Sequence, residues 1–367
     1  MNLRKGTYLL AFLMSFFAHK AYNQSYTAID DDPNDYTAIL DIRSAQDFNP
    51  DSVVVTSTTN FNVRDTVMVH CVKGAIIGTA PGSYPPGDDV YAPGIDAQQP
   101  RNTGKYAFLL IAEIIGDTVV LNASLNPEIL PMQAGEMAQL IKVRSYRYAY
   151  VPAAGISAPS WDPATGTGGV VTFFVHGILR LDGDIDVSSD GFRGAQGSSD
   201  ANYTAGCADP DTMQFFYLDG QVLAGLKGEG STDTSFYYIR GRASSINGGG
   251  GGNGRLAGGG GGSNYSAGVR GGEQSTACTP GDSLTGGSGG FDLGRNGWYY
   301  VNGTSSQANR IFFGGGGGSG TRMAPGTSTD GGNGGGIVVI VADTIQGNGG
   351  GIIANGGDVS GTAVNGA

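Results

Sequence analysis

The sequence has few of the residues that build catalytic or metal centres. Among its 367 residues are three histidines, at positions 19, 70 and 176, and three cysteines, at positions 71, 207 and 278. No Cys-x-x-Cys pair occurs, so neither a zinc motif nor a dithiol redox motif is indicated. His70 and His176 lie in separate apolar runs and give no sign of a Ser-His-Asp set. We therefore expect no catalytic residues, no metal ion and no cofactor.

Charged residues are also scarce, and acidic ones outnumber basic ones. Charged residues form 14% of the chain, against about 25% in an average protein. The formal net charge is −11, and it becomes −14 if residues 1–24, which hold Arg4, Lys5 and Lys20, are removed. Contact with phosphates needs clustered Lys and Arg, so we expect no nucleic-acid partner.

Long apolar runs are missing except near the N-terminus. The run from Tyr8 to Phe17 follows Arg4 and Lys5 and precedes small and polar residues, which is the layout of a secretory signal peptide. It is too short to span a bilayer comfortably. We expect residues 1–24 to be a signal peptide. The mature chain, with no membrane span, would then be extracellular or on the outer cell surface.

Glycine is the residue in excess, with 66 positions, and it clusters after residue 247. Residues 247–272 read NGGGGGNGRLAGGGGGSNYSAGVRGG, and further runs occupy 314–318 and 331–336. No Gly-X-Y period is present, so collagen is excluded. Two interpretations remain: a flexible linker, or segments whose backbones pack closely because no Cβ intervenes.

The rest of the chain has β patterns and no convincing helical period. Residues 25–50 are polar and predict a flexible lead-in. Residues 51–155 are rich in β-branched runs, with a hairpin at Gly116–Asp117, and predict a small β-barrel or sandwich. Tyr146, Tyr148 and Tyr150 alternate as if on one face of a strand.

An internal repeat organises residues 156–367. Residues 169–190 align without a gap to 336–357 at an offset of 167, pairing Val170 with Ile337, Val171 with Val338, Phe173 with Ile340, Ile178 with Ile345 and Ile185 with Ile352. Each copy is a strand followed by turns and short strands, which is the rhythm of a stacked solenoid coil. The two copies bracket a glycine-rich insert, 191–335, which favours ordered glycine packing over a linker. The expected fold class is mostly β, with a β-solenoid-like domain after the small β-domain.

Several segments together resemble a known family. They are FNVRDTVMVHCVKGA (61–75), KYAFLLIAEIIGDTVVL (105–121), QLIKVRSYRYAYV (139–151), SWDPATGTGGVVTFFVHGILRLDGDIDVSSDGFRGA (160–195) and GGNGGGIVVIVADTIQGNGGGIIANGG (331–357). This order resembles the N-terminal part of adhesin-like or gliding-motility-associated surface proteins that Bacteroidota export by the type IX route. Such proteins usually continue to a C-terminal sorting domain, which is not visible here. Either the chain is part of a longer protein or its sorting differs. Residues 247–336 also resemble, by composition, the polyglycine slabs of phage tail-fibre adhesins.

The resemblance implies a non-catalytic adhesin-like or display protein that binds a surface glycan or protein; it does not indicate the oligomeric state. Aromatic residues of the insert are candidate ligand contacts, or alternatively plugs at the edge of the glycine slab: Tyr265, Trp298, Tyr299 and Tyr300. Asp-Ser/Thr pairs followed by an apolar residue resemble the O-glycosylation acceptors of these bacteria, at Ser52, Thr66, Thr118, Thr212, Ser283 and Thr344.

Three further interpretations concern acidic residues and cysteines. Asp182, Asp184 and Asp186 alternate as calcium ligands would, but the repeat copy lacks them, which favours a solvated polar face of the strand. Arg180 beside Asp182 and Asp184 permits an alternative function, a pectin-lyase-like polysaccharide enzyme on a parallel β-helix. Cys207 and Cys278 are candidates for a disulfide in an exported protein, whereas Cys71 lies in an apolar run and is expected as a buried thiol.

Overall fold

The computed structural model describes residues 25–43, 51–77, 100–125, 129–197, 207, 215–218, 224–275, 278, 285–294, 310–321 and 330–358. The expected signal peptide, residues 1–24, lies outside this part. The regular secondary structure of the described residues consists of β-strands alone, which confirms the prediction of a mostly β protein.

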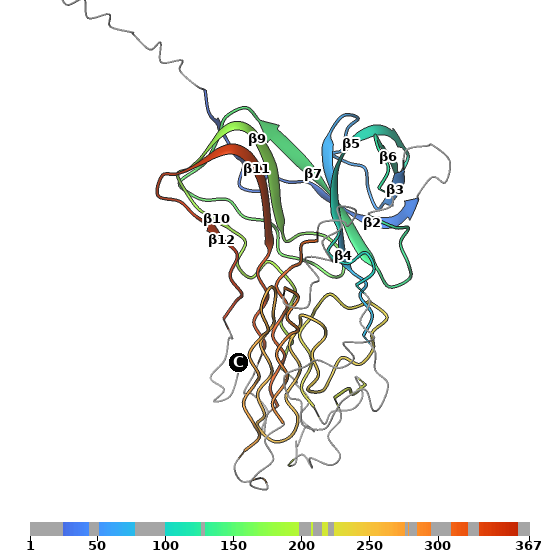
Figure 1. The fold of residues 1–367 in the computed structure, drawn as a ribbon, viewed down its shortest axis with the longest axis vertical. Helices are drawn as coiled ribbons and strands as arrows, with labels where there is room; N and C mark the ends of the chain where they lie inside the picture. The colour runs from blue at the N-terminus through green and yellow to red at the C-terminus, as the bar shows by residue number, and fades with distance from the viewer. Residues whose placement is uncertain are drawn as a thin grey trace, which may run out of the picture.

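Strands β2 to β7 close into an antiparallel ring on one side of the molecule (Figure 1). They are β2 (Tyr36–Arg43), β3 (Ser52–Val55), β4 (Thr66–Lys73), β5 (Tyr106–Ile115), β6 (Thr118–Leu121) and β7 (Met137–Tyr146). Their order is β7-β2-β3-β6-β5-β4, and β4 also pairs with β7, so the ring is closed. Alternating aliphatic side chains such as Val53, Val67 and Leu140 fill this β-barrel.

Two sequence expectations for this region are corrected. Residues 25–50 are not simply a flexible lead-in, because they supply β1 (Thr27–Ala28) and β2, and β2 completes the barrel between β7 and β3. The sequence did not predict β2 because its alternating buried residues, Thr37 and Ile39, form only a short pattern with aspartates on either side. The alternating tyrosines do not share one strand, because the chain bends at Tyr148 between β7 and β8 (Ala149–Val151).

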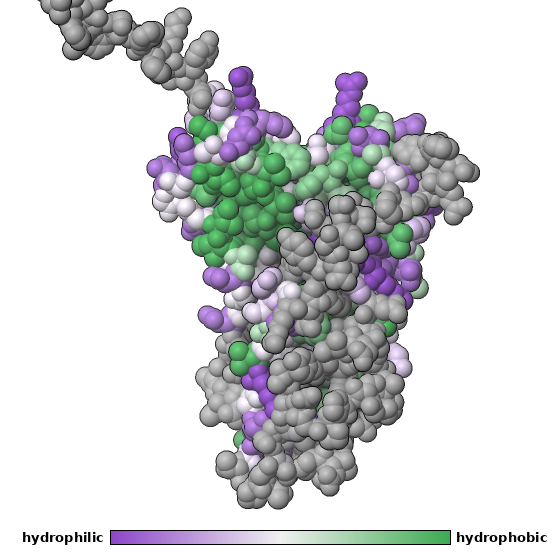
Figure 2. Space-filling model, in the orientation of Figure 1, coloured by the Kyte–Doolittle hydropathy of each residue, from purple (hydrophilic) through white to green (hydrophobic). Residues whose placement is uncertain are grey.

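A parallel stack of strands continues from the barrel. It contains β1, β8, β9 (Val170–Leu181) and β11 (Ile337–Gly347), and the short strands β10 (Ile185–Asp186) and β12 (Ile352–Ile353) pair beside it. Strand β7 pairs with both β2 and β9, so barrel and stack belong to one mixed sheet. The apolar residues of β11 form a surface patch in Figure 2, with Val341 and Ile345 exposed.

The register of this stack matches most of the sequence repeat. Ile337 lies opposite Val170, Ile340 opposite Phe173 and Ile352 opposite Ile185, as the alignment predicted. The predicted pairing of Ile345 with Ile178 is wrong. A bulge between Ala342 and Thr344 moves Ile345 opposite Leu179.

The glycine-rich residues hydrogen-bond to one another through their backbones, and their segments run side by side below the sheet in Figure 1. The N–H groups of residues 314–319 donate in turn to carbonyl oxygens of three neighbouring segments, each at 2.8 or 2.9 Å. Gly314 donates to Gly335 and Gly317 to Gly332 in the first segment. Gly315 donates to Ser263 and Gly318 to Gly260 in the second, and Gly316 donates to Glu229 and Ser319 to Leu226 in the third. The direction of the N–H group therefore repeats every third residue. A polyproline II helix has this geometry, with three residues per turn and no internal hydrogen bonds.

The close spacing of these segments explains why glycine is required. A Cβ added to Gly318 would lie 2.0 Å from the carbonyl oxygen of Gly250, and one added to Gly316 would lie 1.9 Å from that of Arg193. Real Cβ atoms do not approach backbone this closely, so these segments stay this close only while the positions are glycine.

Candidate functional site

The predicted ligand-contact aromatics are only partly described. Tyr265 is 69% exposed, and its carbonyl oxygen accepts a hydrogen bond from Gly294 N at 2.9 Å. Trp298, Tyr299 and Tyr300 lie outside the described residues. Phe312 and Phe313, two further aromatic residues of the glycine-rich insert, are buried and therefore belong to the core. Tyr265 is thus the member of the predicted set that the structure places on the surface.

A second aromatic group was not predicted and is more extensive. Residues 233–239, here called the tyrosine loop, read DTSFYYI. The ring of Tyr237 is 61% exposed and lies 4.4 Å, centroid to centroid, from the ring of Tyr238 at an interplanar angle of 35°. Tyr238 packs in turn on Phe216 and Phe236, at 5.7 and 6.1 Å. The exposed ring therefore stands on a supported cluster.

The base of this cluster is fixed by a buried lysine. Lys227 Nζ lies 4.9 Å from the centroid of Phe216 and donates to the carbonyl oxygens of Phe215 and Gly241, both at 2.9 Å, and to that of Ala243. Burial lowers the pKa of Lys227 well below its usual range. The lysine thus ties the aromatic cluster to the backbone of the glycine-rich segment.

Contacts with the barrel hold the tyrosine loop in place. Asp233 Oδ2 accepts from Arg101 Nη1 at 3.1 Å, and Asp233 N donates to the carbonyl oxygen of Ala75 at 2.9 Å. Thr234 N donates to the carbonyl oxygen of Gly135 at 3.0 Å. Gly135, with φ of 86°, approaches so closely that a Cβ there would meet the Asp233 carboxylate.

These contacts leave a pocket of about 260 Å³ beside the loop. Its lining combines an apolar floor, an ion pair and aromatic rings: Ala75, Ile76, Ile77, Arg101, Asp233, Ser235, Phe236, Tyr237 and Tyr238. The signal in the sequence was the aromatic run Phe236-Tyr237-Tyr238, which follows the polar residues 231–235. It carries no strand or helix period, so pattern analysis passed over it.

A buried ion pair joins the barrel to the glycine-rich region. Glu229 Oε1 accepts from Lys73 Nζ at 2.9 Å and from Trp161 Nε1 at 3.1 Å. The other carboxylate oxygen accepts from the backbone N–H of Arg193 at 3.0 Å. The hydrogen-bonded glycine-rich segments around residues 314–319 are here called the glycine array. Glu229 belongs to this array, because its backbone carbonyl oxygen accepts from the N–H of Gly316. This single carboxylate therefore connects the end of β4 to the array.

The aspartates considered as calcium ligands are occupied by other contacts. Asp182 forms an ion pair with Arg180, with Oδ2 2.7 Å from Nη2, and this contact lowers the pKa of Asp182. Asp184 Oδ1 accepts from the N–H of Gly351 at 2.7 Å. Asp186 Oδ1 accepts from the N–H of Ser188 at 2.9 Å. Each carboxylate thus stabilises local backbone or an ion pair.

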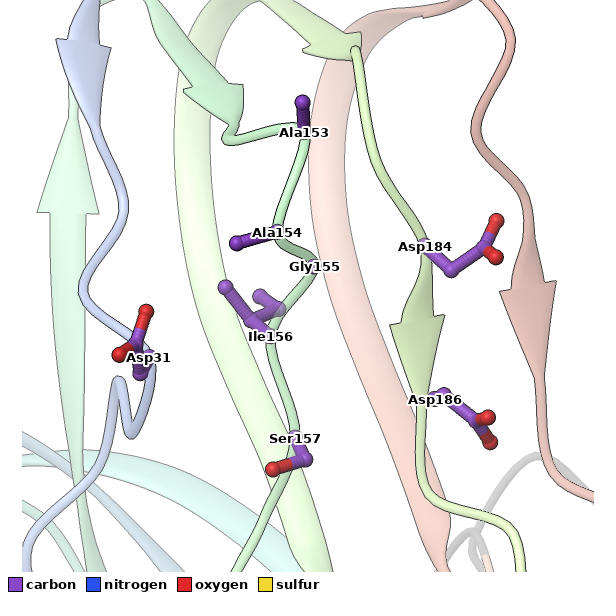
Figure 3. A pocket seen from close by; sticks show the side chains of 8 residues that line it. All are labelled: Asp31, Ala153, Ala154, Gly155, Ile156, Ser157, Asp184 and Asp186. Carbon is purple, nitrogen blue, oxygen red and sulfur yellow. The ribbon is translucent and has the colours of Figure 1, made fainter.

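Asp184 and Asp186 also line an open pocket of about 460 Å³ with Asp31 (Figure 3). The side chains of Asp184 and Asp186 point toward the neighbouring β12 segment, while Asp31 projects from the opposite side of Ala153–Ser157 (Figure 3). Within the described ranges no group of three or more His, Cys, Asp or Glu side chains is arranged to hold a metal ion. The calcium interpretation therefore has no support from the geometry.

The cysteines divide as their sequence contexts suggested. Cys207 and Cys278 form a disulfide with a Cα–Cα distance of 5.4 Å, linking positions 71 residues apart. Cys71 is a buried free thiol in β4, and burial raises its pKa to about 12. That thiol is too rarely ionised at neutral pH to act as a nucleophile.

Accessibility differs among the O-glycosylation candidates. Ser52, Thr66 and Thr118 are half-buried at the first positions of β3, β4 and β6. Thr344 in β11 is exposed. Thr212 and Ser283 lie outside the described residues. Modification stays a prediction, for which Thr344 offers the most accessible hydroxyl in the described part of the chain.

Comparison of the chain with protein-family models, curated proteins and solved structures finds no match in any of the three. Among the residues with described positions, no helix is long and apolar enough to cross a membrane. The contacts and exposed surfaces of the chain itself are therefore the basis for assigning a function.

Proposed function

We propose that the chain is an exported, non-catalytic, adhesin-like surface protein that holds binding loops on a rigid scaffold. In this proposal, a β-solenoid-like domain follows the barrel and carries a polyglycine-packed insert. The observation that carries it is the backbone hydrogen bonding of residues 314–319, which rotates through three neighbouring segments. The resemblance to type IX-exported surface proteins supports the extracellular location.

Rigidity of the glycine-rich region suits a binding role. A loop that is already ordered loses less conformational entropy on binding, so more of its contact energy appears as affinity. Glycine segments are ordinarily the most flexible of all, but here cross-segment hydrogen bonds, the Glu229 contacts and the Cys207–Cys278 disulfide restrain them. In this proposal, loops that connect the hydrogen-bonded segments are presented to a ligand from a rigid base.

Polysaccharide cleavage, the alternative, receives less support from the same geometry. A pectin-lyase-like enzyme needs carboxylates and a basic residue open to the substrate on one strand face. Arg180 and Asp182 bind each other, and Asp184 accepts from a neighbouring backbone N–H. These contacts favour structural roles for the acidic residues.

Two measurements test the proposal together. Hydrogen exchange of the mature chain is expected to be slowed at least about a hundredfold at residues 249–253, 258, 260, 261 and 314–319, because their N–H groups are bonded across segments. Fast exchange at all of these residues would refute the rigid scaffold. Binding of the mature protein to arrays of surface glycans and surface proteins tests the adhesin role, and an absence of binding to both arrays would refute that role.

A further inference from the structure

We propose that the tyrosine loop and the Arg101–Asp233 ion pair form a binding site for one neutral pyranose ring of a surface glycan. This inference rests on the proposed adhesin function and names its ligand class and its contact residues. No residue of this site belongs to the aromatic set that sequence analysis predicted.

The aromatic surface fits the apolar face of a sugar. Tyr237 is 61% exposed yet firmly placed, because Tyr238 supports it at 4.4 Å and Phe216 and Phe236 support Tyr238. Exposing so large a ring to water is unfavourable, and core packing does not explain it. A pyranose presents a face of C–H groups that covers such a ring and removes it from water, while tyrosine tolerates the polar groups around the edge.

The ion pair supplies the polar half of the recognition. Arg101 and Asp233 line the same pocket, with side chains 20% and 13% exposed. Asp233 Oδ2 accepts from Arg101 and Oδ1 from the N–H of Ser235 at 2.6 Å, which leaves a second lone pair on each oxygen for a sugar hydroxyl. A guanidinium offers only donors and a carboxylate only acceptors. Adjacent sugar hydroxyls both donate and accept, so they match a donor and an acceptor placed side by side.

Size and charge narrow the ligand further. The pocket volume of about 260 Å³ lies below the roughly 300–1,000 Å³ of sites for drug-sized molecules, which suits a single ring rather than a buried oligosaccharide. The positive charge of Arg101 is balanced by Asp233 at 3.1 Å. An acidic sugar would meet a carboxylate with no unbalanced cation from this pair, so a neutral sugar is favoured.

The test measures binding of the mature chain to glucose, galactose, mannose and N-acetylglucosamine by calorimetry, and to a glycan array with neutral and acidic members. Tyr237→Ala is expected to weaken binding of the preferred sugar about tenfold, through loss of the stacking ring. Tyr237→Phe keeps the ring and should stay within about threefold of wild type. Leu40→Ala removes an apolar side chain on β2 that is 61% exposed, as Tyr237 is, and is the matched control. Near-ultraviolet circular dichroism checks that all three variants are folded.

The outcomes separate this site from the general function. Neutral-sugar binding that falls in Tyr237→Ala but not in Leu40→Ala supports the inference. Sugar binding that is equal in both variants, or a preference for acidic glycans, overturns it and leaves the adhesin role standing. Binding to a surface protein with no sugar affinity overturns it in the same way. An absence of binding to any glycan or protein overturns both proposals.

Discussion

Substitution of one glycine tests whether backbone packing holds the scaffold together. Gly318 N donates to the carbonyl oxygen of Gly260 at 2.8 Å, and a Cβ on residue 318 would lie 2.0 Å from the carbonyl oxygen of Gly250. Alanine therefore fits only if two segments separate by more than an ångström. Gly261 provides the matched control, because a Cβ there would meet its nearest atom, the backbone N of Val269, at 3.4 Å.

The two substitutions should differ by about 3 kcal/mol in free energy of unfolding. Forcing a methyl group into packed structure costs about 1–3 kcal/mol. Separating the segments also weakens backbone hydrogen bonds on either side of Gly318, at about 1 kcal/mol each. Gly261→Ala meets no clash and limits the freedom of the unfolded chain, so it should be neutral or stabilising by up to about 1 kcal/mol.

Hydrogen exchange and urea unfolding measure both variants under the same conditions. In Gly318→Ala the N–H groups of Gly250, Gly260 and Gly318 should exchange at least about a hundredfold faster than in wild type, whereas Gly261→Ala should leave them unchanged. If Gly318→Ala is as stable and as protected as Gly261→Ala, close backbone contact does not stabilise this region and the reasoning fails.

Three other perturbations address the barrel, its connection to the array, and the disulfide. Burial lowers the pKa of His70 to about 4, so the folded state resists a proton that the unfolded state accepts below about 6.5. Stability should fall as pH drops from 6.5 toward 4, by about 2 kcal/mol between pH 7 and 5. That part of the loss should be missing in His70→Phe and present in His176→Ala; equal pH profiles for the two variants would refute it. Glu229→Gln leaves a buried lysine without its counterion and should cost about 3 kcal/mol in urea unfolding; an unchanged midpoint would contradict the anchoring role. Replacing Cys207 and Cys278 together by serine should cost about 4 kcal/mol, from the 71-residue separation that the disulfide closes; thermal unfolding of this variant should match that of reduced wild type.

The parts of the fold that side-chain patterns encode were predictable. The parallel register of β9 and β11 followed from the aligned apolar positions, because a stacked coil must repeat its buried residues. The hairpin at Gly116 joins β5 to β6 as expected, with φ of 59° at that glycine. The bulge places His176 and Gly177 of β9 against Asp343 alone. The gapless alignment hid it, although a glycine inside a strand often marks a bulge.

The glycine-rich region and the candidate site depended on information that side-chain patterns do not carry. A run of glycines has no apolar periodicity, so the sequence gives no indication of which segment each N–H group of Gly314–Gly318 will meet. Glu229 is a single acidic residue among glycines, and its partner Lys73 lies 156 positions earlier in the chain. Tyr237 belongs to the proposed sugar site only because the tyrosine loop folds against Arg101 and Gly135, and both residues are also far from the loop in sequence.

The three-residue period of the glycine array also restricts how its length can change over evolution. Inserting one residue within 314–319 would turn every following N–H group by a third of a turn, toward the wrong neighbour. An insertion or deletion of three residues would return each donor to its own neighbouring segment, one turn further along it. Length changes inside the array are therefore tolerated in multiples of three. Residues outside the array, such as the tyrosine loop, are free of this restriction, so the proposed binding site can change in length and composition while the array stays constant.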